Sequence, residues 1–200
     1  MNVLGISGTP RKNGNSEILL QYALNPLKKQ GCKVKHFSLR KMIIQPCRGC
    51  EECKKMNKCI INDDMDHIYE AFRWCDALII SSPVYSRNIC SQLMAVLDRH
   101  YAVNIERPLE GKVGGAIAVG RGTCGGQSIA INSIYTWLLA CGVICVPGEL
   151  HGVTAVASEP GDILKQEKRL RQAEILGVNV LNIAKKLRAK TSNDLKNKNA

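Results

Sequence analysis

Near its start the chain runs Asn2-Val3-Leu4-Gly5-Ile6-Ser7-Gly8-Thr9-Pro10-Arg11-Lys12-Asn13-Gly14-Asn15-Ser16, a short apolar run that passes directly into a polar loop. After the loop, apolar residues recur at helical spacing as far as Leu27. A short apolar run, a polar loop and a helical period predict a strand, a turn and a helix. The same succession returns along the chain, so this first unit indicates the architecture of the whole.

Four further apolar segments predict strands. Residues 32–39 alternate between apolar and polar, whereas residues 76–82 form a continuous apolar run typical of a central strand in a parallel sheet. Strands alternating with helices predict an α/β doubly wound fold, whose ligands bind at the carboxyl ends of the strands. The remaining strands are expected at 113–119 and 142–146, and the remaining helices at 68–72, 89–101, 127–141 and 164–187.

The first loop combines groups that suit a phosphate. It offers hydroxyl and amide side chains, and its glycines let backbone N–H groups crowd one point. Asn15 or Ser16 would cap the following helix, whose amino-terminal dipole adds partial positive charge. The Walker A order G-x-x-x-x-G-K-S/T is missing, so we do not expect nucleoside triphosphate hydrolysis. A simple capped turn is the alternative interpretation.

Two later loops suit a planar ligand. The third strand leads into Ser82–Asn88, where Pro83 stiffens the turn and Tyr85 offers a flat ring with a polar tip. The fourth strand leads into Gly120–Gly126, which formally matches G-x-G-x-x-G. A dinucleotide fingerprint follows the first strand and needs an acidic residue about 20 positions later, where this chain has Cys141 and Gly142. We therefore interpret this stretch as a loop that closes over a ligand's ring.

Four cysteines are inserted between the second strand and the next helix, in a loop at residues 43–62. Their spacing is C-x2-C-x2-C-x5-C, and one looping segment with such intervals favours a [4Fe–4S] cluster. Zinc is the first alternative, although its ligands usually come from two separated pairs, and free or disulfide-bonded thiols are the second. The expected ligands are Cys47, Cys50, Cys53 and Cys59, the last being the nearest candidate for the fourth position.

The chain has ten cysteines, which argue for metal or redox chemistry in a reducing compartment. We expect a cytoplasmic protein without a signal peptide, because the apolar run at 3–6 is too short for one, and no run is long enough to span a membrane. The other six cysteines are expected to be small core residues. They are Cys32, Cys75, Cys90, Cys124, Cys141 and Cys145.

The net charge of +11 is unevenly distributed. Residues 1–60 hold 12 Lys and Arg against 3 Asp and Glu, so the surplus lies where anionic groups are expected; a solvated positive surface is the alternative. We expect no nucleic-acid partner, because no recognition motif is present and only nine aromatic side chains are available for stacking. Residues 1–189 are expected to form one domain, and the lysine-rich segment 190–200 a disordered tail.

Several of these stretches form one pattern across residues 2–150. They are Ser7–Arg11 with Asn15 and Ser16, the cysteine run, Ser82–Tyr85, Gln92–Arg99 and Gly120–Gly126. Together they resemble the iron–sulfur flavoproteins, a branch of the NAD(P)H-dependent FMN reductases with a flavodoxin-like fold; ordinary members of that superfamily lack the cysteine run. One departure is Ser86-Arg87-Asn88, where relatives often have small or aromatic residues.

The resemblance implies FMN and one [4Fe–4S] cluster held by the four cysteines named above. It also implies a homodimer or homotetramer in which one subunit's cluster lies near another's FMN. The implied flavin contacts are Ser7, Thr9, Arg11, Asn13, Asn15 and Ser16 at the phosphate, and Pro83, Val84, Tyr85, Ser86, Gly120, Arg121, Gly122 and Gly125 at the ring.

Our hypothesis is that the cluster takes electrons from an acidic donor such as ferredoxin, which the positive surface would steer, and passes them to FMN and on to an acceptor. A NAD(P)H-dependent reductase of quinones or free flavin, with an accessory cluster, is one alternative. A non-catalytic redox sensor is another, and a zinc-stabilised binding module is the simplest.

Overall fold

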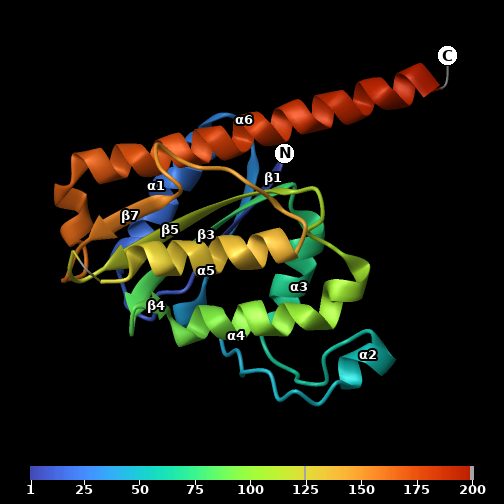
Figure 1. The fold of residues 1–200 in the computed structure, drawn as a ribbon, viewed down its shortest axis with the longest axis horizontal. Coiled ribbons are helices and arrows are strands. Elements are labelled where there is room, and N and C mark those ends of the chain that lie inside the picture. The colour runs from blue at the N-terminus through green and yellow to red at the C-terminus, as the bar shows by residue number, and fades with distance from the viewer. Residues whose placement is uncertain (124, 199–200) are drawn as a thin grey trace.

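A parallel sheet runs through the centre of the computed structural model, which describes residues 1–123 and 125–198 (Figure 1). The order reverses beside the first strand, since β1 has β2 on one side and β3 on the other. This confirms the doubly wound, five-stranded parallel sheet. Its strands, in spatial order, are β2 (Lys33–Ser38), β1 (Asn2–Ser7), β3 (Ala77–Tyr85), β5 (Val113–Gly120) and β6 (Ile144–Cys145).

Helices cover both faces of the sheet (Figure 1). One face packs against α1 (Asn15–Lys29) and α6 (Glu167–Lys198), and the other against α3 (Met65–Trp74), α4 (Ser91–Arg99) and α5 (Gln127–Ala140). Shorter helical segments are α2 (Glu52–Met56), η1 (Leu39–Lys41), η2 (His100–Glu106) and η3 (Asp162–Lys165).

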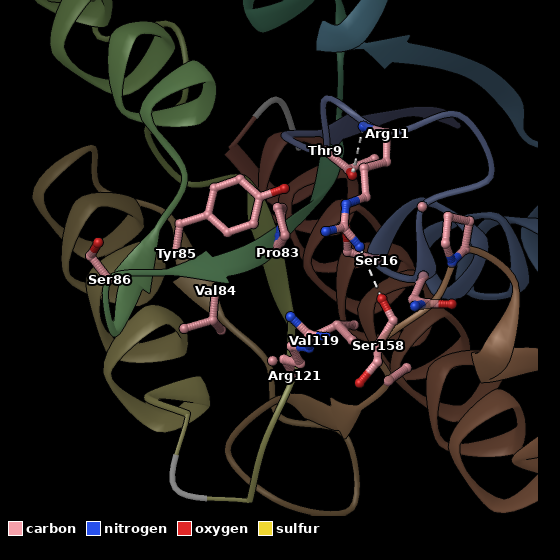
Figure 2. A pocket seen from close by; sticks show the side chains of 15 residues that line it. Thr9, Arg11, Ser16, Pro83, Val84, Tyr85, Ser86, Val119, Arg121 and Ser158 are labelled. Carbon is pink, nitrogen blue, oxygen red and sulfur yellow. Dashed lines mark hydrogen bonds between the residues drawn. The ribbon is translucent and has the colours of Figure 1, made fainter.

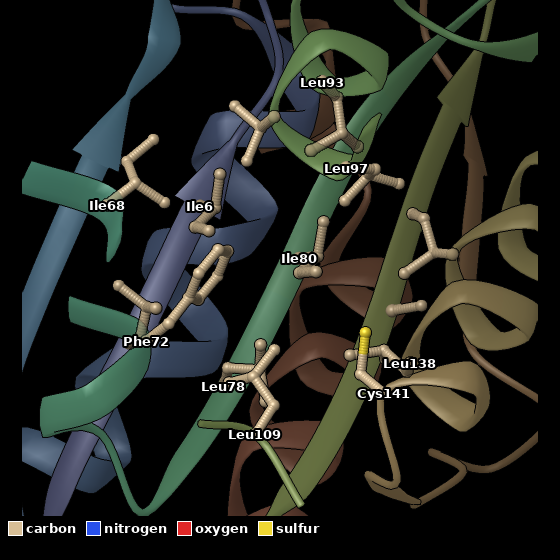
Figure 3. Packing of buried hydrophobic residues seen from close by; sticks show 14 of the residues in the cluster. Ile6, Ile68, Phe72, Leu78, Ile80, Leu93, Leu97, Leu109, Leu138 and Cys141 are labelled. Carbon is tan, nitrogen blue, oxygen red and sulfur yellow. The ribbon is translucent and has the colours of Figure 1, made fainter. Parts of the chain in front are cut away.

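Alternating strand residues divide the core into two layers. Ile6 and Ile80 are in register and face α3, α4 and α5, and they belong to one buried cluster with Phe72, Leu93 and Leu138 (Figure 3). Burying one such side chain contributes roughly 1.5–3 kcal/mol. Residues of the opposite parity face α1 and α6; a Cβ on Gly5, for example, would lie 2.6 Å from Leu24. The side to which each strand residue points is therefore fixed by the pleat.

The carboxyl half of the sheet differs from the prediction. The expected fifth strand at 142–146 is reduced to β6, because Gly142 has a left-handed φ of 76° and Pro147 ends the strand. A separate strand, β7 (Val153–Val156), pairs with β5 farther along, beginning at Ile117. A further short strand, β4 (Asn88–Ile89), forms an antiparallel hairpin with the end of β3.

The last helix is longer than predicted. It continues to Lys198 and so includes most of the segment 190–200 for which we had expected a disordered tail; residues 199–200 lie outside the described residues. Of the six cysteines expected in the core, Cys75, Cys90 and Cys141 are buried, Cys32 and Cys145 are partly exposed, and Cys124 lies outside the described residues. In the part of the chain that the structure describes, no helix is both long and apolar enough to cross a membrane.

Candidate functional site

A cavity of about 310 Å³ opens at the carboxyl ends of β1, β3 and β5. This is the edge at which the strand order reverses, where doubly wound folds bind their ligands. Figure 2 shows the side chains of the β3 hairpin on one side of the cavity and Arg11, Ser16 and Ser158 on the other. Ten of the predicted flavin contacts line it: Thr9, Arg11, Asn15, Ser16, Pro83, Val84, Tyr85, Ser86, Gly120 and Arg121.

The loop after β1 is tightly folded around Thr9. This side chain is 2% exposed, and its Oγ1 accepts a hydrogen bond from the Arg11 backbone N–H at 3.3 Å. Gly14 is required beside it, because a Cβ there would collide with Thr9 Oγ1. Asn13 occupies a left-handed conformation with φ 55° and does not line the cavity. The loop thus brings Arg11 and the first turn of α1 to one side of the cavity.

Helix α1 begins differently from the prediction. Neither Asn15 nor Ser16 caps it, since Gly14 occupies the N-cap position without a side-chain hydrogen bond. Asn15 instead reaches across the cavity wall, donating from Nδ2 to Glu159 O at 2.9 Å and accepting from Ile163 N at 3.1 Å. The Ser16 hydroxyl is buried, has no hydrogen-bond partner in the part of the chain that the structure describes, and belongs to a residue that lines the cavity, so an anion at the helix terminus would find an available donor.

Ser7 lies behind the loop and does not line the cavity. It is in register with Ser38 on one neighbouring strand and Ser81 on the other, and all three hydroxyls are buried without a hydrogen-bond partner among the described residues. Because residue 7 has the parity of Gly5, its side chain points toward the α1 side of the sheet. Of the predicted phosphate contacts, Ser7 and Asn13 are therefore set apart from the cavity.

The β3–β4 hairpin forms the opposite wall. Ser86 and Arg87 occupy its two-residue turn with φ of 48° and 66°, the left-handed pair that suits the twist of a tight hairpin. Tyr85 is 39% exposed at the mouth of the cavity. The glycine loop leans on this turn, because a Cβ on Gly126 would collide with the backbone of Arg87. The hairpin and the glycine loop consequently form one continuous edge.

Among the described residues of the glycine loop, the first two reach the cavity. Gly120 and Arg121 line it, whereas Gly122 and Gly125 do not. Gln127 Nε2 holds the loop in place by donating to Gly122 O at 2.8 Å and to Ala155 O at 3.3 Å. The loop is thereby tied to β7.

The segment after β7 is a wall of the cavity that sequence reasoning missed. Arg11 Nη1 donates to Ser158 O at 2.9 Å, and Ala157 and Pro160 also line the cavity. Its position depends on β7, a four-residue strand too short for its pattern to be distinctive. The Ser158-Glu159-Pro160-Gly161 stretch was the available signal, since serine, proline and glycine are typical of turns.

The four cysteines line a second, smaller cavity of about 140 Å³ beside α2 and η2. Its other walls combine apolar side chains, Ile60, Ile61 and Tyr101 among them, with the charged residues Arg48, Glu51, Asp98 and Arg99. Cys47 and Cys50 are exposed, and Cys53 and Cys59 are partly exposed. Within residues 1–123 and 125–198, no three His, Cys, Asp or Glu side chains converge as a group for a single metal ion. The thiols share one cavity without meeting at one point.

The electrostatics of this second cavity are less positive than the sequence suggested. Burial, followed by the proximity of Cys59, Cys50 and Cys47, raises the pKa of the Cys53 thiol. Three lysines of the loop are paired with carboxylates: Lys54 with Glu51 at 2.8 Å, Lys55 with Glu52 at 3.0 Å and Lys58 with Asp66 at 3.8 Å. The local surplus is therefore partly neutralised, and such exposed pairs are further screened by salt.

Helix α4 separates the two cavities. Cys90, immediately before it, contacts the loop after β1 through Sγ and Gly8 O at 3.0 Å. Arg99, its last residue, contacts Cys59 Sγ at 3.5 Å, a link that sequence reasoning did not foresee. A nine-residue helix is about 13 Å long at 1.5 Å per residue. The two cavities of one chain thus lie at opposite ends of α4.

The chain is similar to several known proteins. Residues 1–156 match the family model described as NADPH-dependent FMN reductase. An iron–sulfur flavoprotein of Methanocaldococcus jannaschii is 38% identical over 189 residues, covering 92% of this chain and 98% of the relative. An iron–sulfur flavoprotein of Methanosarcina thermophila is 38% identical over 157 residues, covering 77% of this chain and 82% of the relative.

Among solved structures, RosB with a bound riboflavin-5′-phosphate derivative superposes with a TM-score of 0.76. The superposition covers 100% of this chain and 88% of the RosB chain, and the two sequences are 14% identical. A flavodoxin of the WrbA-like type from Agrobacterium tumefaciens gives a TM-score of 0.67 at 14% identity, covering 92% of this chain and 98% of its own. At these identities the likeness establishes the fold, which is flavodoxin-like.

Proposed function

The chain belongs to the NADPH-dependent FMN reductase family and within it to the iron–sulfur flavoproteins, and we propose that it passes electrons through a [4Fe–4S] cluster to FMN and on to an acceptor. That it is an FMN-dependent oxidoreductase follows from the family. One observation supports the proposed electron path: a cavity at the switch point of the sheet and a cavity lined by four cysteines occur in one chain, at opposite ends of α4.

The first cavity suits FMN. Arg11, Thr9 and the first turn of α1 supply positive charge and N–H or O–H donors for the phosphate. Pro83, Val84 and Tyr85 offer a flat edge to the ring system on the other side. FMN, when bound, supplies the transfer of one or two electrons; the chain binds it, orients it and limits access of water to it.

The second cavity suits a cluster better than one zinc ion. A zinc site needs four ligands within about 2.3 Å of one atom. In a four-iron cluster each thiolate binds a different iron, so the four sulfur atoms need not converge on one atom; here the four cysteines line one cavity without converging. Cys47, Cys50, Cys53 and Cys59 would hold the cluster, whose contribution is single-electron transfer.

The separation of the cavities supports assembly into a homodimer or homotetramer. Electrons would otherwise have to travel the length of α4, whereas a second subunit can place its own cysteine cavity beside the flavin edge. The proposed donor is an acidic ferredoxin-like protein, attracted by the excess of basic residues in the first 60 positions. The free cysteines favour a reducing compartment such as the cytoplasm.

NAD(P)H is the second candidate donor, and the description of the matched family favours it. The two donors are separable by experiment. Protein purified without oxygen is mixed with NADPH or with reduced ferredoxin, and bleaching of the flavin is followed. Faster bleaching by ferredoxin supports the main proposal, whereas rapid bleaching by NADPH alone favours the second.

Cofactor content is the direct test. We expect about four irons, matching sulfide and one FMN per chain after anaerobic purification. Zinc without iron would refute the cluster, and iron without flavin would refute the assignment of the first cavity.

A further inference from the structure

Arg99 closes the base of the cysteine loop. Its side chain is 1% exposed. Nη1 donates to Gln45 O at 3.2 Å, and Nη2 donates to Ile61 O at 3.2 Å. Gln45 stands two residues before the first cysteine of the loop, and Ile61 two residues after the last. A single guanidinium at the end of a rigid helix therefore fastens both ends of the segment.

Asp63 completes the fastening. It forms an ion pair with Arg99 Nη1 at 2.5 Å and is itself 3% exposed. Its Oδ2 also accepts from Gln45 N at 2.8 Å, while Oδ1 accepts from Met65 N at 3.1 Å. Because the pair is buried and hydrogen-bonded on both sides, removing either partner leaves a buried charge uncompensated. These contacts need no metal.

The guanidinium also touches one of the four thiols. Arg99 Nη2 lies 3.5 Å from Cys59 Sγ, on the nitrogen that does not contact Asp63. Asp63 contacts the other terminal nitrogen, Nη1, so the N–H groups of Nη2 are left for the sulfur and for Ile61 O. Charges act more strongly in such a buried setting than at the surface, where the loop lysines lie.

We propose that Arg99 is a positioning residue that fixes the ends of the cysteine loop and raises the reduction potential of the cluster through Cys59. The second part rests on the proposed function. Adding one electron takes the core from 2+ to 1+ and makes the thiolate-ligated cluster more negative, so a fixed positive charge and an N–H donor at one sulfur favour the reduced form. Arginine is suited to the task, because its planar fork serves four acceptors at once.

The test is a potentiometric titration of the anaerobically purified holoprotein with dithionite as the electron source, followed by the electron paramagnetic resonance signal of the reduced cluster. In Arg99→Gln we expect the equilibrium constant for one-electron reduction to fall about tenfold, a shift of about 59 mV to lower potential. Arg99→Lys should shift less, since it keeps the charge. Lys54→Gln, which removes an exposed charge beside Cys53, is the matched control and should shift least.

A second measurement covers variants that load little iron. Hydrogen exchange of metal-free, FMN-bound protein should be at least tenfold faster at Gln45, Met65 and their neighbours in Arg99→Gln than in wild type, with α1 unchanged. Unaltered hydrogen exchange in Arg99→Gln would refute the claim that Arg99 fixes the ends of the cysteine loop. An unaltered reduction potential in an iron-loaded Arg99→Gln variant would refute the claim that Arg99 raises it. Absence of iron from the wild type would refute the cluster while leaving the exchange result to decide the fastening.

Discussion

Replacing Arg11 by glutamine should make the flavin site less able to distinguish FMN from riboflavin. Arg11 lies on the loop that faces the amino terminus of α1 and bonds Ser158 O across the cavity. A hydrogen bond to a charged group contributes about 1.5–3 kcal/mol. Arg11 is exposed, so the lower part of that range applies, and at about 1.4 kcal/mol per factor of ten the loss is roughly ten- to thirtyfold in FMN affinity.

The comparison with riboflavin isolates the phosphate. Arg11→Gln also removes the bond to Ser158, but that loss affects both ligands equally, whereas only FMN carries the phosphate. Dissociation constants for both flavins, measured by fluorescence quenching on flavin-free protein, should give an FMN-to-riboflavin ratio ten- to thirtyfold smaller than in wild type. Added salt should reduce the difference between wild type and Arg11→Gln in this ratio, because it screens the charge of Arg11.

Lys12 provides the control. It is an exposed cation of the same loop that does not line the cavity, so Lys12→Gln should leave the ratio within about twofold of wild type. An unchanged ratio in Arg11→Gln would show that the phosphate lies elsewhere, and an equal effect of both substitutions would reduce the role of Arg11 to general attraction.

Three further outcomes follow from the contacts. Cys53→Ser should lose most of its iron but retain FMN near wild-type content, because the two cavities lie at opposite ends of α4; parallel loss of flavin would contradict that separation. Gly177→Ala should lower the free energy of unfolding by about 1–3 kcal/mol in thermal melts, because the new Cβ would collide with Ala23 O in α1, while Gly122→Ala, at an open position, should change it little. Burial lowers the pKa of His100 to about 4, so its contribution to stability is present above the unfolded pKa of about 6.5 and is lost as the pH falls toward 4. Between pH 7 and 4.5 the free energy of unfolding, measured with urea, should therefore fall by about 2–3 kcal/mol more in wild type than in His100→Phe. The same dependence of that free energy on pH in both proteins would refute this account.

The sequence was most informative where periodicity and loop chemistry coincide. The order of strand, loop and helix between Asn2 and Leu27 was predicted correctly, because the strand is almost wholly buried and the helix keeps one apolar stripe, although the predicted helix cap was wrong. β7 was missed because four residues after an interrupted strand carry too little pattern, and the cavity wall at Ser158 was missed with it.

The long-range polar contacts lay beyond sequence reasoning for a different reason. Arg99 and Asp63 are 36 positions apart, and each looks like an ordinary surface charge in its local context. Asn15 looked like a helix cap, because a cap requires only local geometry, whereas its actual partners Glu159 and Ile163 come from the other end of the chain. Such pairs are decided by packing in three dimensions, which spacing does not encode.

The buried ion pair of Arg99 and Asp63 also has a consequence for the insertion of a cluster into the newly folded protein. If the cysteine loop were disordered in the metal-free protein, ordering it would oppose cluster binding by about 1–2 kcal/mol per residue. Here Arg99 holds both ends of the cysteine loop through Gln45 O and Ile61 O before any cluster is present. Inserting a cluster would then order fewer residues, and its entropic cost would be smaller.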